Sequence, residues 1–206
     1  MLIKVCGIKT EENIKFLSDS DIEMVGLNFY KPSVRYITEK IDPSIFDKFK
    51  PEVKRVGVFV NEQAEQILDI AKKYKLDYVQ LHGDEDQEFC EYISNSLPII
   101  KVFRIDEKFD FKSIGNYAMA SLFLFDTQTI HYGGSGKKFD WKILMQYTGT
   151  TPFLLSGGIG PDDHIELSQI DHPQFIGIDI NSKFESAPGV KDRNLIIPFI
   201  NSIRES

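Results

Sequence analysis

The sequence has few cysteines, no long apolar run and no excess of basic residues. Only two of its 206 residues are cysteines, Cys6 and Cys90, which is too few for a disulfide framework and fits a reducing cytoplasm. No stretch of about 18 apolar residues is present to span a membrane, and the polar first residues do not resemble a signal peptide. The net charge of −7 disfavours nucleic acid and anionic lipid as partners. We therefore expect a cytoplasmic protein with neither a nucleic-acid nor a membrane partner.

The remaining composition is that of an ordinary globular protein. Hydrophobic residues make up 42% of the chain and charged residues 27%, so disorder is not the default interpretation. A chain of this length is long enough for one domain with a sizeable core. Because no linker or low-complexity segment interrupts it, we expect residues 1–206 to form a single domain.

Eight short β-rich runs recur along the chain. Several are nearly continuous in Val, Ile, Leu and Phe, which is typical of parallel strands that are buried on both faces. The runs are Leu2–Cys6, Glu23–Asn28, Arg55–Val60, Tyr78–Leu81, Ile99–Phe103, Leu122–Phe125, Phe153–Leu155 and Phe175–Ile178.

Helical patterns fill the gaps between these runs. Thr10 is expected to cap one helix, and Asn61 to cap another that continues to Tyr74. Pro161 is expected to open a third helix. The last helix contains Pro198 and is expected to kink there.

Strands that alternate with helices predict right-handed βαβ units and a parallel sheet. Eight units in 206 residues place the chain near the lower size limit of the α/β class known as the (β/α)8 TIM barrel. The alternative is an open doubly wound sheet, which usually has fewer strands and, for dinucleotides, a Gly-x-Gly-x-x-Gly turn after the first strand. Here that strand ends in Cys6-Gly7-Ile8-Lys9, so we predict a single-domain (β/α)8 TIM barrel.

Polar residues at the C-terminal ends of the predicted strands form the candidate site, because barrels of this kind place their chemistry there. Cys6 and Asp126 are the acid–base candidates, since a thiol can act as a general base once its thiolate is favoured. Taken alone, Cys6 fits a small buried hydrophobe equally well, and Asp126 a helix cap or a paired surface acid. His82 either orients a substrate or simply packs. Cys90 lies in a helical stretch and is interpreted as structural.

Two glycine-rich turns predict a phosphate site. Ser156-Gly157-Gly158 follows the seventh strand, and Gly133-Gly134-Ser135-Gly136 follows the sixth. Glycines let backbone N–H groups approach an anion closely. The loops after strands seven and eight, with a short extra helix, are the usual phosphate cradle, and Asn181–Ala187 is short enough to be that helix. The alternative is that these segments are only tight turns.

Arginines are the best anion anchors, and the histidines predict no metal site. Arg35 and Arg104 follow predicted strands, and a guanidinium can pair with a carboxylate through two hydrogen bonds. His131, His164 and His172 have no ligand spacing among them, so we predict no metal.

The ordered set of motifs resembles the phosphoribosylanthranilate isomerase family over essentially the whole chain. Singly most of these motifs are unspecific, but together and in this order they are highly specific. The matching segments are Lys4–Ile8, Val56–Asn61, Val79–Gly83, Phe125–Thr127, Gly133–Gly136, Phe139–Trp141, Leu155–Ile159, Gly177–Asp179, Glu185 and Pro188–Asp192.

The resemblance implies an activity and roles for individual residues. The family converts N-(5′-phosphoribosyl)anthranilate to 1-(2-carboxyphenylamino)-1-deoxyribulose 5-phosphate, a step of tryptophan biosynthesis, without cofactor or metal. Carried over, Cys6 is the general base, Asp126 is the general acid and Arg35 binds the anthranilate carboxylate. Backbone groups near Gly158, Asn181 and Ser182 would hold the phosphate, and His82, Gly157 and Asp179 complete the expected substrate-binding set. The expected partner is a phosphorylated small molecule, and the chain is expected to be a monomer or a homodimer.

The chain departs from the family pattern at two loops, and two other functions compete. Val34 replaces a common proline before Arg35, and Lys183 replaces a common glycine after the eighth strand.

One competing function is the histidine-pathway Amadori isomerase, which carries an aspartate where Cys6 stands. The other is a non-catalytic phosphate-binding barrel, which has no need of Cys6 together with Asp126.

Overall fold

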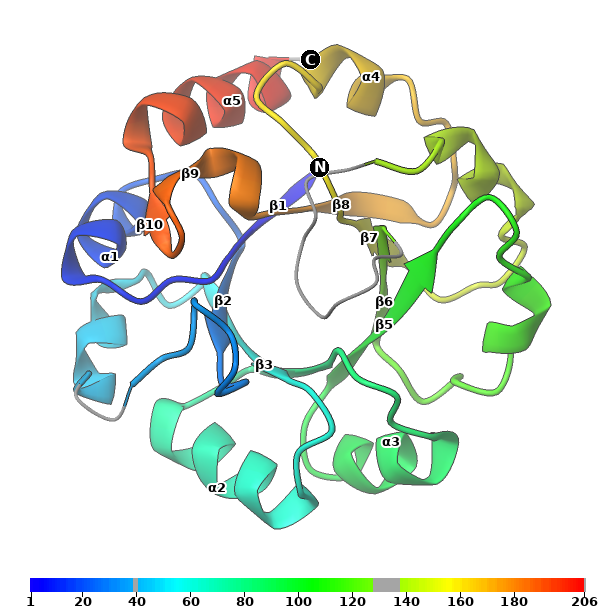
Figure 1. The fold of residues 1–206 in the computed structure, drawn as a ribbon, viewed down its shortest axis with the longest axis horizontal. Helices are drawn as coiled ribbons and strands as arrows, with labels where there is room; N and C mark the ends of the chain where they lie inside the picture. Colours follow the sequence, from blue (N-terminus) through cyan, green and yellow to red (C-terminus); the bar gives the residue numbers. More distant parts are fainter. Residues whose placement is uncertain (39–40, 128–137, 206) are drawn as a thin grey trace.

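Eight parallel strands close into a barrel in the computed structural model, which describes residues 1–38, 41–127 and 138–205. The strands follow one another around the barrel in chain order, and β1 closes the ring by pairing with β8 (Figure 1). Their bounds are β1 Leu2–Cys6, β2 Met24–Asn28, β3 Lys54–Phe59, β4 Tyr78–Leu81, β5 Ile99–Ile105, β6 Leu122–Thr127, β7 Phe153–Leu155 and β8 Phe175–Ile180. The predicted (β/α)8 barrel and its eight strands are confirmed.

An outer ring of helices surrounds the barrel, but only part of it is α-helical (Figure 1). The α-helices are α1 Glu11–Ser18, α2 Ala64–Tyr74, α3 Gln87–Ser94, α4 His164–Ser168 and α5 Arg193–Glu205. Short 3-10 helices cover the barrel after β2, β5 and β6, namely η1 Pro43–Lys48, η2 Phe111–Ile114 and η3 Trp141–Gln146. These short connections explain how 206 residues suffice for eight units.

The three 3-10 helices start with the same side-chain cap. In each, an aspartate carboxylate accepts a hydrogen bond from the backbone N–H two residues later, in pairs Asp42–Ser44, Asp110–Lys112 and Asp140–Lys142. A short aspartate side chain that bonds to its own backbone favours turns and caps over extended helix.

Two expected helix starts are wrong, and one is confirmed. Thr10 caps α1, since its hydroxyl accepts the Asn13 N–H at 3.2 Å. Asn61 does not cap α2; it adopts a left-handed backbone with φ of 50°, and its side chain accepts the Asp84 N–H at 2.8 Å. Pro161 belongs to a turn, and α4 begins only at His164. Pro198 lies inside α5 as expected, while the kink there stays a prediction.

The apolar residues form two layers because side chains alternate along each strand. One set fills the barrel interior towards the N-terminal ends of the strands. It includes Met24, Val56, Ile100, Leu122 and Leu154. The other set packs between the strands and the surrounding helices, and it includes Ile3, Val25 and Phe125. The barrel is therefore a packed core at its N-terminal end, and only its C-terminal mouth remains for polar chemistry.

The segment after β8 differs from the expected extra helix. Only three residues form a 3-10 turn, η4 Ser182–Phe184. The chain then makes a small antiparallel hairpin of β9 Glu185–Ala187 and β10 Val190–Lys191. This hairpin places Glu185 and Lys191 beside the barrel mouth, where they contact Arg35 and Asn181.

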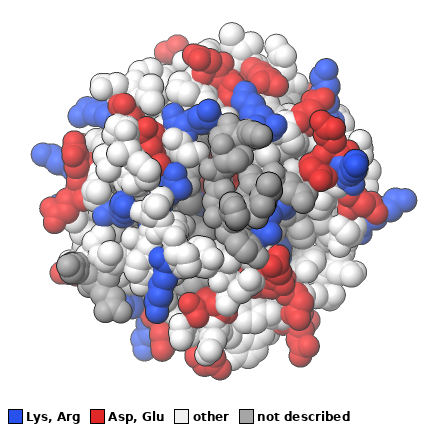
Figure 2. Space-filling view, in the orientation of Figure 1, with Lys and Arg blue, Asp and Glu red and all other residues white. Residues whose placement is uncertain are grey.

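No helix within the described residues is long and apolar enough to cross a membrane. Acidic and basic side chains are interspersed over the face of the molecule seen in Figure 2, so no uninterrupted patch of one charge dominates its rim.

Candidate active site

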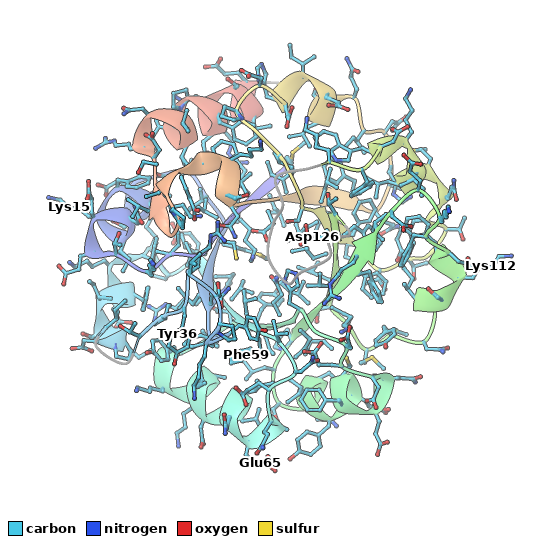
Figure 3. All side chains as sticks on the ribbon, in the orientation of Figure 1. Lys15, Tyr36, Phe59, Glu65, Lys112 and Asp126 are labelled. Atoms are coloured by element: carbon cyan, nitrogen blue, oxygen red, sulfur yellow. The ribbon has the colours of Figure 1, made fainter. Side chains whose placement is uncertain are left out.

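One pocket at the barrel mouth brings together all nine site residues that the sequence predicts. Its lining includes Cys6, Arg35, His82, Asp126, Gly157, Gly158, Asp179, Asn181 and Ser182. Three of them, Cys6, Asp126 and Asp179, lie in strands and converge because residues two positions apart share a face. The other six come from the segments that follow the strand ends. In Figure 3, Asp126 lies within the ring of strands, whereas Lys15, Glu65 and Lys112 project outward from the surrounding helices and loops.

Cys6 is buried at the end of β1. It lies opposite Gly26 of β2, and a Cβ atom at position 26 would come within 2.6 Å of Cys6 Sγ. The absence of a side chain at Gly26 thus makes room for the thiol. Burial raises the pKa of Cys6, while the positive charges of Lys4 and Lys191 oppose that shift. The position of the thiol at a buried strand end does not lower its pKa. Only the neighbouring positive charges act in that direction.

Lys4 and Asp179 form a buried ion pair next to the thiol. They face each other across the β1–β8 ladder, and Lys4 Nζ lies 2.9 Å from Asp179 Oδ2. The lysine is completely buried. Burial alone would lower the pKa of Lys4, but the charges of Asp179 and Cys6 outweigh it and raise that pKa. Asp179 Oδ1 is buried and has no hydrogen-bond partner among the described residues.

Asp126 is held from several sides. His82 Nε2 lies 3.3 Å from Asp126 Oδ2, and the Thr127 N–H donates to Oδ1 at 2.8 Å. The Gln80 amide contacts the other ring nitrogen of His82 at 3.1 Å. If that amide nitrogen donates to Nδ1, the proton of a neutral His82 resides on Nε2, where it faces Asp126.

Gly157 allows this arrangement. A Cβ atom there would come within 2.7 Å of Asp126 Oδ1 and 2.5 Å of the Thr127 backbone nitrogen, and its φ is +90°. Glycine is the residue that tolerates both the close approach and the left-handed backbone. Gly157 therefore contributes to the placement of Asp126, a role beyond the predicted phosphate cradle.

Arg35 is anchored by the hairpin after β8. Its Nε donates to Glu185 Oε1 at 2.9 Å and its Nη2 to Oε2 at 2.7 Å. Lys191 Nζ donates to the same Glu185 at 2.7 Å and to Asn181 Oδ1 at 2.7 Å. Burial raises the pKa of Glu185, but the hydrogen bonds and charges from Arg35 and Lys191 outweigh it and lower that pKa. The carboxylate is thus ionised and fixes one edge of the guanidinium.

Arg104, the second candidate anchor, lies outside this pocket lining. Its Nη2 donates to the His82 carbonyl at 3.1 Å, and Nη1 lies 3.6 Å from Asp84 Oδ1. These two contacts connect it to the loop after β4. His131 and the turn Gly133–Gly136 lie outside the described residues. Among the residues that the structure describes, no cluster of three His, Cys, Asp or Glu side chains is placed to hold a metal.

Sequence analysis does not single out Lys4, Glu185 or Lys191 as functional. A usable signal exists for Lys4, because a lysine two residues before Cys6 in an otherwise apolar strand must share its face. No comparable local signal exists for Glu185 and Lys191, since their contacts depend on the hairpin that follows β8.

Comparisons with known proteins agree with this geometry. The family model of N-(5′-phosphoribosyl)anthranilate (PRA) isomerase matches residues 3–202. The N-(5′-phosphoribosyl)anthranilate isomerase of Phocaeicola vulgatus is 43% identical over 208 residues, which cover 100% of this chain and 98% of that protein.

Solved structures give the same result at the level of the backbone. The phosphoribosyl anthranilate isomerase from Thermotoga maritima matches with a TM-score of 0.89 and 38% identity over 100% of both chains. A structure of phosphoribosyl anthranilate isomerase in complex with reduced 1-(o-carboxyphenylamino)-1-deoxyribulose 5-phosphate matches with a TM-score of 0.86 and 34% identity, again over 100% of both chains. On this evidence the chain belongs to the N-(5′-phosphoribosyl)anthranilate isomerase family.

Proposed function

We propose that Cys6 and Asp126 carry out the isomerisation of N-(5′-phosphoribosyl)anthranilate, with Cys6 as general base and Asp126 as general acid. The observation that carries this proposal is their common pocket, into which β1 and β6 contribute one proton-transfer group each. Because β7 and β8 separate these two strands, the groups act on a bound sugar from different sides. Both stand at strand ends, where barrel enzymes place their chemistry.

The proton transfers follow from these roles. Asp126 donates a proton to the furanose ring oxygen, the bond from that oxygen to C1′ breaks, and C1′ becomes a protonated Schiff base with the anthranilate nitrogen. The thiolate of Cys6 then removes the C2′ proton, and the electron pair of that C–H bond forms the enolamine. Tautomerisation of the enolamine gives the ketone, so the atoms of substrate and product are the same. A base and an acid positioned in this way typically contribute about 10²- to 10⁴-fold each.

The other residues of the pocket bind the carboxylate and the phosphate of the ligand. Arg35, with one guanidinium edge held by Glu185, binds the anthranilate carboxylate. Backbone groups near Gly157, Gly158, Asn181 and Ser182 hold the phosphate. Asp179 accepts a sugar hydroxyl through its unpartnered Oδ1, and His82 orients Asp126.

The phosphate-binding role rests on backbone groups. Within residues 1–38, 41–127 and 138–205, the N–H groups of Gly157 and Gly158 have no hydrogen-bond acceptor. Both glycines line the pocket and have positive φ angles, 90° and 71°. Consecutive N–H groups in this conformation form a concave anion site.

The activity assay tests the assignment directly. Purified protein should abolish the fluorescence of N-(5′-phosphoribosyl)anthranilate, and the product should have an unchanged mass. Cys6→Ala should lower kcat by about 10²-fold or more, and Cys6→Ser should also fail because a hydroxyl is far less acidic than a thiol. Cys90→Ala is the matched control and should keep its activity, since Cys90 is buried in α3. Wild-type turnover in Cys6→Ala would show that another group is the base.

We further propose that the chain works in the cytoplasm, as a monomer or a homodimer, on a phosphorylated small molecule. Its low cysteine content supports the first point. Analytical ultracentrifugation over a range of concentrations tests the second, and species larger than a dimer would contradict it.

A further inference from the structure

Five charged side chains surround the thiol of Cys6. Lys4 and Asp179 come from β1 and β8, Glu185 and Lys191 from the hairpin β9–β10, and Arg35 from the loop after β2. β2 itself places Gly26 against the thiol and so adds no titratable group. Lys4, Lys191 and Asp179 interact electrostatically with Cys6 directly, and so does Arg35.

Hydrogen bonds link these side chains into two branches. Lys4 binds Asp179 at 2.9 Å. Arg35 and Lys191 both bind Glu185, at 2.7 to 2.9 Å. The side chains of Lys4 and Lys191 are both 0% exposed, and those of Asp179 and Glu185 are 6% and 4% exposed. Such burial makes an unbalanced charge costly.

Asp126 and His82 also interact electrostatically with Asp179, but they are paired with each other at 3.3 Å. Apart from that pair, the charge of this cluster is balanced only when Cys6 is ionised. With each group in its ordinary charge state, Lys4, Lys191 and Arg35 contribute three positive charges, whereas Asp179 and Glu185 contribute two negative ones. Burial lowers the pKa of Lys191 and raises the pKa of Asp179, and the ion-pair partners Glu185 and Lys4 oppose these shifts. With a neutral thiol the buried group therefore carries one excess positive charge, and a thiolate at Cys6 cancels it. Of the three cations, the two lysines should affect the ionisation of Cys6 most strongly, because neither lysine side chain is exposed to solvent that would screen its charge.

We propose that Lys4 and Lys191 are positioning residues that stabilise the thiolate of Cys6, and that they do so by leaving this buried cluster one positive charge in excess. The inference rests on the proposed role of Cys6 as the base. Burial raises the pKa of the Cys6 thiol. The excess positive charge acts in the opposite direction, because loss of the thiol proton removes that charge imbalance. The proposal thus explains how a buried thiol can supply a base.

The rate of Cys6 alkylation by iodoacetamide, followed as a function of pH, tests the proposal without any turnover. Cys90→Ala is the background, so that only Cys6 reacts. Lys4→Gln and Lys191→Gln remove one charge each while keeping a hydrogen-bond donor. Each should raise the midpoint of the alkylation profile by about one pH unit or more. Lys4→Arg or Lys191→Arg should bring the midpoint back towards the wild-type value.

Lys101→Gln is the matched control. Lys101 is as buried as the other two lysines and forms an ion pair with Glu85 at 2.8 Å, but it lies outside the pocket that holds Cys6. Its loss should lower the melting temperature to a similar extent and leave the Cys6 midpoint in place. An unchanged midpoint in whichever lysine variant folds, or an equal rise in Lys101→Gln, would overturn the proposal.

A kinetic measurement separates this inference from the proposed base. In Lys4→Gln and Lys191→Gln the acidic limb of the kcat/KM profile should move to higher pH together with the alkylation midpoint. If Cys6→Ala retains wild-type activity, the role of the base fails, whereas the alkylation midpoints still decide the role of the lysines. If the midpoints stay fixed while Cys6→Ala is inactive, the base stands and the inference about the lysines is wrong.

Discussion

Arg35 and Glu185 are joined by two parallel hydrogen bonds, although 150 positions separate them in the chain: Nε to Oε1 at 2.9 Å and Nη2 to Oε2 at 2.7 Å. This pair engages one edge of the guanidinium and leaves the edge that carries Nη1 for a ligand. The loop after β2 and the hairpin after β8 thereby hold one another at the pocket. Lys191 binds the same carboxylate, so Glu185 orders two cations at once.

Glu185→Gln should therefore weaken substrate binding more than turnover. The amide keeps the shape of the side chain but removes the charge that orients Arg35, so KM should rise by about tenfold, which corresponds to about 1.4 kcal/mol. Stability should fall by about 1 to 3 kcal/mol, because Lys191 and Arg35 lose a buried partner. Steady-state kinetics and thermal unfolding measure both effects.

Glu166→Gln is the control for that change. Glu166 lies 3.5 Å from Lys138 in an exposed pair, and surface pairs of this kind contribute little. The idea of a positioning role for Glu185 fails if KM stays at the wild-type value in Glu185→Gln, or if kcat alone changes.

Arg35→Ala and Asp126→Asn should affect different kinetic constants. An anchor that grips the carboxylate equally in the ground and transition states contributes uniform binding, so Arg35→Ala should mainly raise KM. The Asp126 proton is needed only as the ring opens, so Asp126→Asn should mainly lower kcat, by about 10²-fold or more. If Arg35→Ala binds carboxylated ligands as tightly as wild type, the anchor lies elsewhere, and Arg104 becomes the next residue to test.

The fold and the polar residues at the strand ends are predictable from local periodicity, whereas the remaining pocket residues are expected from the family resemblance. The ends of the eight apolar runs are enough to find Cys6, His82, Asp126 and Asp179, since barrel closure brings strand ends together. The ion pairs are less predictable. Nothing local to Glu185 indicates that it binds Arg35, because the contact depends on a hairpin whose sequence also fits a short helix.

Helix boundaries were the weakest part of the prediction for a related reason. Asn61 is a good capping residue by type, yet it takes a left-handed backbone and binds the Asp84 N–H instead. A cap that bonds across to a neighbouring loop gives the same sequence signal as a cap on its own helix. Only the position of the loop after β4 distinguishes the two.

Cys90 should make stability depend on pH in the alkaline range. Burial raises the pKa of Cys90 from 9.0 to about 11, so the folded state keeps a proton that the unfolded state loses. The unfolded state thus binds fewer protons, and the free energy of unfolding falls as pH rises. Between pH 9 and pH 11 wild type should lose about 2 kcal/mol more than Cys90→Ala.

Urea unfolding at several pH values measures this difference. Other groups that titrate in the same range are common to both proteins and largely cancel in the comparison, except Tyr117, which interacts electrostatically with Cys90. Cys90 is interpreted as a structural thiol inside α3, with its Sγ 3.9 Å from the Glu85 carbonyl. If the free energy of unfolding depends on pH in the same way in both proteins, folding does not raise the pKa of Cys90.

Phosphate binding should depend on the backbone at Gly158 and little on Lys183. The three-residue turn Ser182–Phe184 is too short to contribute a helix dipole of the kind expected from sequence, so the anion must rely on N–H groups such as those of Gly157 and Gly158. Lys183 is exposed, where one charge interaction contributes roughly 1 kcal/mol or less. Gly158→Val places a branched side chain in the anion's space, and its φ of 71° strains that residue further.

Because this strain lowers the melting temperature by itself, the quantity to compare is the rise in melting temperature that inorganic phosphate produces in each protein. Wild type and Lys183→Gly should show similar rises, and Gly158→Val should show almost none. If Lys183→Gly loses the rise while Gly158→Val keeps it, the phosphate site is built around the lysine and the backbone cradle is wrong.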